Sequence, residues 1–388
     1  MFTDLDWMTQ LAESIRDAEA LAERLHLEPE TRAALDRLAG SDTLPFRVTP
    51  YWLSLAGAGA GPGDPILAQC LPSPREFEPD PDALPDPLGE SRHRAAPSLV
   101  RQYRSRALLR ASGECAVHCR HCFRRTLLPS ERGFISPEDQ SAVAAWLAER
   151  PEIREILVSG GDPLVASDGR VESLLSSLRA ARPEATLRVC TRCPSTLPMR
   201  FTPGLVGLLR AFRPLRVVTH FNHPRELSPQ ADEALGNLID AGIPVFVQTV
   251  LLRGINDDPD VLEGLFSGLV RRGAQPYYLF QGDLAPGTAH LRCSLSRGLA
   301  IYAELRSRLS GLELPRYAVD APGGGGKAFL PEDIEGREGD RFILRTPSGG
   351  RAYYPADGPG DTKPVNPSAR LDSTVGCNPL DSEYTGRG

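Results

Sequence analysis

CAVHCRHCFRR, at residues 115–125, is the stretch of sequence that decides the fold. It places three cysteines within eight residues: Cys115, Cys119 and Cys122. Thiolates are the usual ligands of iron–sulfur clusters, and one loop that supplies three of them leaves one iron of a four-iron cluster open to a small molecule. The alternatives are three unligated buried cysteines or a zinc site completed by His118 or His121, although structural zinc sites favour Cys-x-x-Cys pairs. The spacing predicts a [4Fe-4S] cluster.

On both sides of this loop, β-rich runs alternate with amphipathic helical segments. Strands are expected at residues 107–112, 155–160, 187–192, 215–221, 244–252 and 275–280. Helices are expected at residues 137–149, 170–183, 203–212, 229–241, 259–272 and 296–310. This alternation predicts right-handed crossovers and a parallel sheet that curls toward a barrel. Six units leave an eight-fold barrel incomplete, so the predicted fold class is α/β, an incomplete (β/α)6 barrel.

The remaining sequence is expected to flank this barrel. The predicted regions are residues 1–55, 56–98, 99–330 and 331–388. The first is helical from residue 7 to 38, with an interruption at Glu28-Pro29. The second is a Pro/Gly-rich linker that wraps in extended form, because its composition sustains neither a helix nor a ladder. The third is the barrel, and the last contains a β-hairpin at residues 340–356 followed by an extended tail.

Composition narrows the class of protein. Hydrophobic residues at 41% and charged residues at 24% are typical of a globular chain. The net charge of −6 argues against nucleic acid as a partner, since that requires a clustered basic face. We expect no membrane span, because no stretch approaches about 18 uncharged apolar residues. Eight cysteines with one tight cluster favour metal binding in a reducing compartment, so a cytoplasmic protein is expected.

Five segments in this order resemble the radical S-adenosylmethionine (SAM) superfamily, and specifically the lysine 2,3-aminomutase family: CAVHCRHCFRR, ILVSGGDPL, THFNHP, VQTVLLRGIND and VDAPGGGGK. The resemblance covers roughly residues 100–355. It implies that the open iron binds SAM and that the reduced cluster cleaves it to methionine and a 5′-deoxyadenosyl radical. It also implies pyridoxal phosphate as the second cofactor, and an electron donor such as flavodoxin or ferredoxin as a partner.

The resemblance further implies which residues contact the cofactors. Those expected at SAM are Ser159, Gly160, Gly161, Asp162, His220 and Gln248. Those expected at pyridoxal phosphate are Arg106, near its phosphate, Tyr103, and Lys327, which forms a Schiff base with its aldehyde. Gln102 replaces an adjacent family arginine, which leaves the phosphate contacts incomplete. A simple strand-to-helix turn is the alternative role for the two glycines, and a hinge is the alternative for the glycine run before Lys327.

Three charged residues predict the substrate. Arg124 can make the two-pronged contact that carboxylates favour, and it matches the family arginine for the substrate carboxylate. Asp283 and Asp320 match the family carboxylates that receive a terminal ammonium group, although an aspartate at a strand end often caps a helix instead. L-lysine, converted to β-lysine, is therefore the first choice. Arginine is the second, because its guanidinium also suits paired carboxylates and because Phe280 stands where relatives carry a tyrosine, which alters the pocket.

Two other functions are compatible with the same sequence. One is a lysine aminomutase whose product is attached to a translation factor, and another is a non-enzymatic iron–sulfur protein. The sequence leaves open whether the chain forms a homo-oligomer. Cys190 and Cys193 are expected to be incidental strand-end cysteines, because no second pair completes a zinc site. Cys377 stands alone in a segment that holds zinc in some relatives, so no zinc is expected there.

Overall fold

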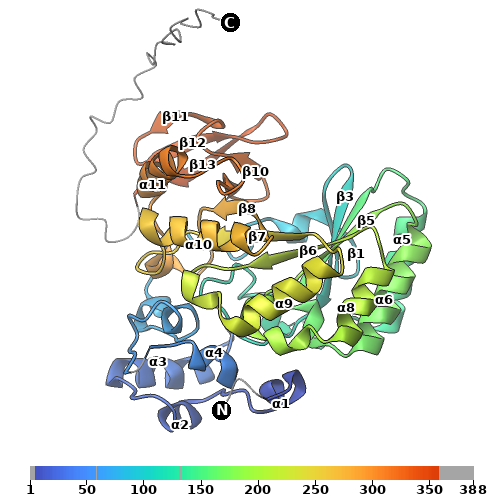
Figure 1. Cartoon of the computed structure of the whole chain (residues 1–388). Coiled ribbons are helices and arrows are strands. Elements are labelled where there is room, and N and C mark those ends of the chain that lie inside the picture. Colours follow the sequence, from blue (N-terminus) through green and yellow to red (C-terminus); the bar gives the residue numbers. More distant parts are fainter. Residues whose placement is uncertain (1–4, 58, 131–132, 358–388) are drawn as a thin grey trace, which may run out of the picture.

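The computed structural model describes residues 5–57, 59–130 and 133–357, and the predicted tail with Cys377 lies outside them. A single sheet of ten strands, in the order β1 to β10, forms the centre (Figure 1). The strands are β1 (Arg94–Ala96), β2 (Leu99–Tyr103), β3 (Arg106–Ser112), β4 (Glu155–Gly160), β5 (Thr186–Cys190), β6 (Leu215–His220), β7 (Val245–Val250), β8 (Gln275–Phe280), β9 (Arg316–Ala321) and β10 (Gly326–Phe329).

The pairing of the strands confirms the predicted fold and extends it. Each strand from β3 to β9 pairs in parallel with the next, and β3 to β8 are the six predicted strands. Strand β9 is a seventh parallel strand that was not predicted. Strands β1 and β2 add antiparallel pairs at one edge, and β10 adds one at the other. The sheet is therefore a partial α/β barrel with antiparallel edges.

Six longer helices cover the outer face of the sheet (Figure 1), and all six were predicted: α5 (Pro137–Ala148), α6 (Asp168–Ala181), α8 (Pro203–Ala211), α9 (Pro229–Asp240), α10 (Pro259–Arg271) and α11 (Leu295–Arg308). A short helix, α7 (Cys193–Thr196), follows β5. Four of the six begin with a proline that follows a capping side chain: Ser136, Thr202, Ser228 and Asp258. Each cap accepts a hydrogen bond from a backbone N–H of the first turn, and proline needs no such partner.

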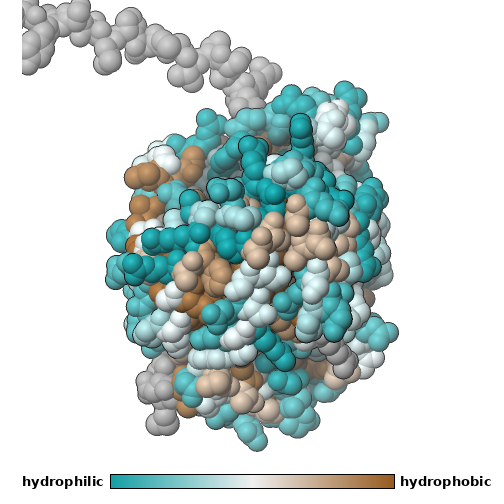
Figure 2. Space-filling view, turned by 90° about the vertical axis from the view of Figure 1, so that its right-hand side faces the viewer, coloured by the Kyte–Doolittle hydropathy of each residue, from teal (hydrophilic) through white to brown (hydrophobic). Residues whose placement is uncertain are grey.

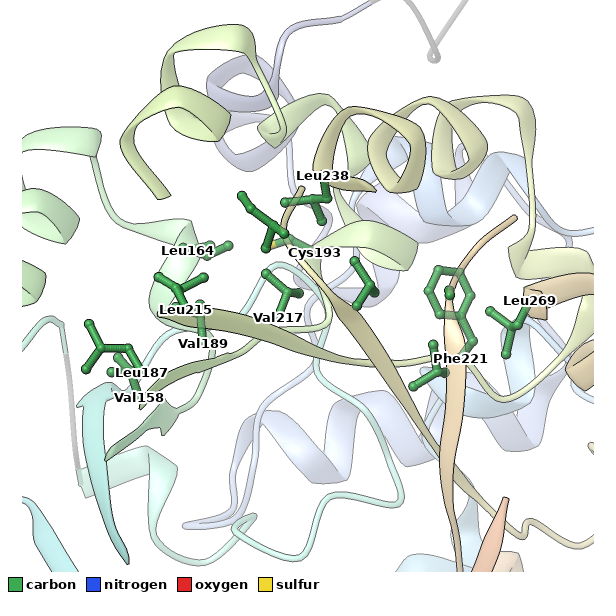
Figure 3. Packing of buried hydrophobic residues seen from close by; sticks show 14 of the residues in the cluster. Val158, Leu164, Leu187, Val189, Cys193, Leu215, Val217, Phe221, Leu238 and Leu269 are labelled. Carbon is green, nitrogen blue, oxygen red and sulfur yellow. The ribbon is translucent and has the colours of Figure 1, made fainter. Parts of the chain in front are cut away.

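Alternate strand residues form the main core. Val158, Val189 and Val217 lie on neighbouring strands and are at most 2% exposed. They belong to one buried cluster with helix residues such as Leu238 and Leu269 (Figure 3). Because successive strand side chains point to opposite faces, the residues between them face the interior of the barrel. Burying each such aliphatic side chain contributes about 1.5–3 kcal/mol.

The N-terminal region differs from the prediction. Its helices are α1 (Trp7–Ala12), α2 (Ala18–Ala22), α3 (Pro29–Ala39) and α4 (Pro50–Ser54). The expected helix before Glu28 is broken, because Ile15 and Val48 exchange backbone hydrogen bonds of 2.9 and 3.0 Å. Asp17 then caps α2 as a new helix. Two long-range backbone hydrogen bonds thus override the local helical periodicity.

The linker is more structured than its composition predicts. It contains the short 3-10 helices η2 (Leu67–Gln69), η3 (Pro74–Phe77) and η4 (Glu90–His93), as well as β1. Ile66, Leu67 and Cys70 are fully buried against the N-terminal helices. The expectation of a purely extended segment is therefore wrong, because apolar residues between the prolines reach a core.

The C-terminal hairpin is present as β12 (Arg341–Arg345) and β13 (Arg351–Pro355), and β11 (Ile334–Glu338) adds a third strand. This small sheet lies at the opposite end of the molecule from helices α1 to α4 (Figure 1). No helix among the described residues is long and apolar enough to cross a membrane. On the face shown in Figure 2, hydrophilic residues surround smaller hydrophobic areas.

Candidate active site

The loop after β3 carries the three clustered cysteines, and the N-terminal region and linker hold it in place. The backbone N–H of His118 donates to the carbonyl of Arg47 over 2.9 Å, and that of Arg120 donates to the carbonyl of Gln69 over 2.8 Å. Val117 is buried in the N-terminal core, which also contains Trp52. The segments before the barrel therefore position the cysteine loop.

The thiols themselves are suited to a cationic cluster. Burial raises the pKa of Cys122 to about 11 and that of Cys115 well above its usual range. Such thiols ionise only when a cation compensates the charge. The sulfur of Cys119 accepts a hydrogen bond of 2.8 Å from Nη1 of Arg192, a residue that sequence reasoning missed. The three cysteines thus fit a [4Fe-4S] cluster.

The zinc alternative requires His118 or His121 as a further ligand. Among the described residues, no three His, Cys, Asp or Glu side chains converge on one ion position, and this applies to the three cysteines as well. Nδ1 of His118 lies 2.8 Å from the carbonyl oxygen of Pro45 and donates to it. Cys190 ends β5 and Cys193 is buried at the start of α7, and neither forms a disulfide. That both are incidental stays a prediction.

The two glycines at the end of β4 are needed for contact with the cysteine loop. Gly160 has a φ of +119°, and a Cβ there would lie 2.3 Å from the carbonyl oxygen of Ser112. A Cβ on Gly161 would lie 2.5 Å from the carbonyl oxygen of Glu114, next to Cys115. The glycines therefore allow the strand end and the loop to touch, which places any ligand of the loop beside β4.

Asp162 has a structural task. Its carboxylate accepts hydrogen bonds from the hydroxyl of Thr191, from the backbone N–H of Arg192 and from that of Leu164. These bonds tie the end of β4 to the end of β5. Protein donors thus occupy the carboxylate oxygens of Asp162. If Asp162 contacts SAM, as predicted, the contact is expected to involve its backbone.

His220 and Gln248 are neighbours, as their places at the ends of β6 and β7 predict. They are directly paired in the parallel register. Burial, with the charge of Arg192, lowers the pKa of His220 to about 4, so the imidazole is neutral. His223 instead caps the 3-10 helix η8 (Pro224–Glu226), in line with a structural role.

Lys327 lies opposite Asp320 in the pairing of β9 and β10. Its Nζ lies 2.8 and 3.0 Å from the two carboxylate oxygens of Asp320 and 4.0 Å from the centre of the Phe280 ring. Asp283 is nearby: burial and the charge of Asp320 raise its pKa to about 8, while Lys327 and Arg124 act in the opposite direction. Asp320 and the predicted Schiff-base lysine are thus in contact, and Asp283 lies within range of their charges.

Two further residues predicted to contact pyridoxal phosphate, Tyr103 and Arg106, adjoin this lysine. The hydroxyl of Tyr103 accepts a hydrogen bond of 2.9 Å from the backbone N–H of Lys327. The guanidinium of Arg106 lies 3.9 Å from the centre of the Tyr103 ring. Gln102 donates to the carbonyl of Gly324 over 3.0 Å. Gln102 therefore holds the glycine turn and is not available to bind a phosphate. Arg106 and Tyr103 remain as the side chains that can bind an anion here.

Arg124 is buried but already has a partner that sequence reasoning missed. Its Nη2 lies 2.6 Å from a carboxylate oxygen of Glu90, in η4, and its Nη1 donates to the hydroxyl of Ser159 and the carbonyl of Gly160. The expected open arginine is thus a fixed one. No sequence signal marks Glu90, which stands in a Pro-rich, acidic linker.

A barrel with three cysteines after its first parallel strand is the arrangement of a radical SAM enzyme, and residues 110–263 match the Radical SAM superfamily. The chain is 40% identical to a putative L-lysine 2,3-aminomutase of Treponema pallidum, over 81% of this chain and 91% of the relative. It is 37% identical to an L-lysine 2,3-aminomutase of Fusobacterium nucleatum, over 88% and 80%. The chain therefore belongs to the lysine 2,3-aminomutase family, whose members are isomerases. A glutamate 2,3-aminomutase of Clostridioides difficile, 34% identical over 89% and 82%, represents a related branch.

Proposed function

We propose that this enzyme converts L-lysine to β-lysine with pyridoxal phosphate bound to Lys327. The observation that carries the proposal is the pair of carboxylates around that lysine. Burial and the neighbouring charge of Asp320 raise the pKa of Asp283, because two close carboxylates resist a second negative charge. The ammonium of Lys327 supplies the compensating charge in the free protein.

That compensation changes when Lys327 bonds to the aldehyde of the cofactor. Its nitrogen is then committed to the cofactor, and Asp283 and Asp320 need another cation. The terminal ammonium of lysine supplies one, whereas the side-chain carboxylate of glutamate adds a third negative charge. The acids therefore favour a substrate with a second amino group, which distinguishes this chain from an enzyme for an acidic amino acid.

Other residues fit the cofactors that this reaction requires. The cysteine loop fits the [4Fe-4S] cluster that binds SAM. The segment Ser159–Asp162 contacts the start of that loop, and His220 and Gln248 lie side by side at the ends of β6 and β7. Arg106 and Tyr103 offer a charge and a hydroxyl to the phosphate. SAM supplies the radical and pyridoxal phosphate supplies the π-system that lets the amino nitrogen migrate. The protein binds the substrate at both ends, orients its β-carbon and excludes water.

The partners and setting follow from this chemistry. The cluster needs an external electron donor, and flavodoxin or ferredoxin meets that need. All seven cysteines of the described residues are free thiols. Free thiols of this number favour a reducing compartment, and we propose a cytoplasmic location.

The test is turnover of an amino-acid panel under strict anaerobiosis with SAM, pyridoxal phosphate and a reductant. The ratio kcat/KM is measured for lysine, arginine, ornithine, glutamate and alanine, and lysine is expected to be highest. A preference for arginine would indicate that the substrate pocket is larger than lysine requires, which would be consistent with Phe280 in place of tyrosine. A preference for glutamate or alanine would contradict the two-carboxylate argument. If the protein binds pyridoxal phosphate, seen by its absorbance, the non-enzymatic iron–sulfur alternative is excluded.

A further inference from the structure

Glu90 is a buried carboxylate that holds one side of Arg124. Its side chain is 6% exposed, although it lies in a linker rich in proline and acidic residues. Both Nε and Nη2 of Arg124 donate to it, over 3.2 and 2.6 Å. A carboxylate that spans these two nitrogens fixes the plane of the guanidinium, since the two parallel hydrogen bonds allow one orientation.

The other nitrogen of Arg124 is held as well. Nη1 donates to the hydroxyl of Ser159 over 3.2 Å and to the carbonyl of Gly160 over 3.1 Å. Among the described residues, the second N–H of Nη2 has no hydrogen-bond acceptor. The edge formed by Nη1 and Nη2 is thus the one that a substrate carboxylate can approach, after it displaces the weaker contact with Ser159. Glu90 instead contacts the edge formed by Nε and Nη2, so it orients the guanidinium group and leaves the edge formed by Nη1 and Nη2 to the substrate.

The turn that carries Glu90 is itself fixed to the lysine loop. Asp86 accepts hydrogen bonds of 2.9 Å from the backbone N–H groups of Glu90 and Ser91. Gly89 has a φ of +63°, and a Cβ there would lie 2.8 Å from the Cα of Gly324. One short turn therefore contacts both the proposed carboxylate-binding arginine and the glycine run that precedes Lys327.

Glu90 also contacts a second arginine. Nη1 of Arg110 lies 3.5 Å from its second oxygen, and both arginine side chains are about one-tenth exposed. Glu90 therefore lies between two guanidinium groups.

We propose that Glu90 is a positioning residue: it holds Arg124 in the orientation that receives the substrate's α-carboxylate. The inference rests on the proposed function, because it assumes that Arg124 binds the carboxylate. By this proposal, different residues recognise the two ends of the substrate. Glu90 acts at the carboxylate end through Arg124, and Asp283 and Asp320 act at the ammonium end.

The experiment compares two ligands that differ only in the carboxylate. L-Lysine and 1,5-diaminopentane are titrated into cluster- and pyridoxal-phosphate-loaded enzyme without SAM, so that no turnover occurs, and binding is followed by the absorbance of pyridoxal phosphate. Glu90→Gln is expected to weaken lysine binding at least tenfold and to change diamine binding by less than twofold. Glu90→Asp, which keeps the charge on a shorter side chain, is expected to fall between Glu90→Gln and the wild type for lysine.

The controls separate this role from a general loss of structure. Arg92→Gln, an exposed residue of the same turn, should bind both ligands like the wild type. Equal weakening of both ligands by Glu90→Gln, or no change in either, overturns the proposal. A wild-type enzyme that binds the diamine as tightly as lysine shows that Arg124 does not recognise a carboxylate, which overturns it as well. If the wild type lacks pyridoxal phosphate or responds to neither ligand, the proposed function fails instead.

Discussion

Glu76 should make a large contribution to stability, and its replacement by glutamine tests how the cysteine loop is held. The carboxylate is buried, and it accepts hydrogen bonds from Arg120 over 2.9 and 2.5 Å and from Arg125 over 2.5 Å. Both arginines lie in the cysteine stretch and are at most 3% exposed. The variant Glu76→Gln leaves two buried guanidinium groups with a neutral partner.

The expected cost follows from that burial. Removing one partner of a buried ion pair costs about 3–5 kcal/mol, because the remaining charge is desolvated and uncompensated. We expect Glu76→Gln to lower the free energy of unfolding by about that amount, measured by urea titration of the full-length chain at pH 7. Glu78→Gln is the matched control: its side chain is 65% exposed and lies 4.0 Å from Arg75. That control should change stability by about 0.5 kcal/mol or less.

The effect should also depend on pH. Burial acts to raise the pKa of Glu76, but the charges of Arg120 and Arg125 outweigh it and hold that pKa below its ordinary value. A lowered pKa contributes stability above the pKa of the unfolded chain and loses it as the pH falls through the folded value. The difference between wild type and Glu76→Gln should thus be full at pH 7 and shrink below about pH 4. A difference no larger than that of Glu78→Gln, or one independent of pH, would refute the reasoning.

The remaining predictions concern the site. Cys119→Ala should abolish cleavage of SAM by the reconstituted enzyme, and retained cleavage would contradict the cluster assignment. Lys327→Ala should lose the adduct that borohydride traps with pyridoxal phosphate, and an adduct mapped to another lysine would show the site to be wrong. Asp283→Asn and Asp320→Asn should each lower kcat/KM for lysine at least tenfold more than for alanine, and equal losses would remove the argument for a cationic substrate.

The barrel was predictable because its signals are local. The six helices begin and end within about two residues of their expected limits, since the prolines and capping residues that start them are visible in the sequence. Strand β9, Arg316–Ala321, was not predicted because a glycine run follows it closely, and such a run is typical of a turn. The break between α1 and α2 was missed because it depends on Val48, a distant partner.

The sequence predicted which residues form the site, but it did not predict their contact partners. Asp320 and Lys327 are seven residues apart, and the structure brings them together through the turn between β9 and β10. The partners of Arg124 could not be foreseen in the same way. A glutamate in a Pro-rich, acidic linker has the composition of a solvated residue, and only the course of the chain reveals its burial.

The linker supplies negative charges that compensate the buried arginines of the cysteine stretch. Three arginines between Cys119 and Thr126 are buried: Arg120, Arg124 and Arg125. Their charges cannot all remain uncompensated in a dry interior. Two linker carboxylates supply the opposite charge: Glu76 pairs with Arg120 and Arg125, and Glu90 pairs with Arg124. The acidic character of residues 56–98 is thus partly an internal counter-charge, and these ion pairs act together with the buried apolar residues Ile66, Leu67 and Cys70 to hold the segment in place.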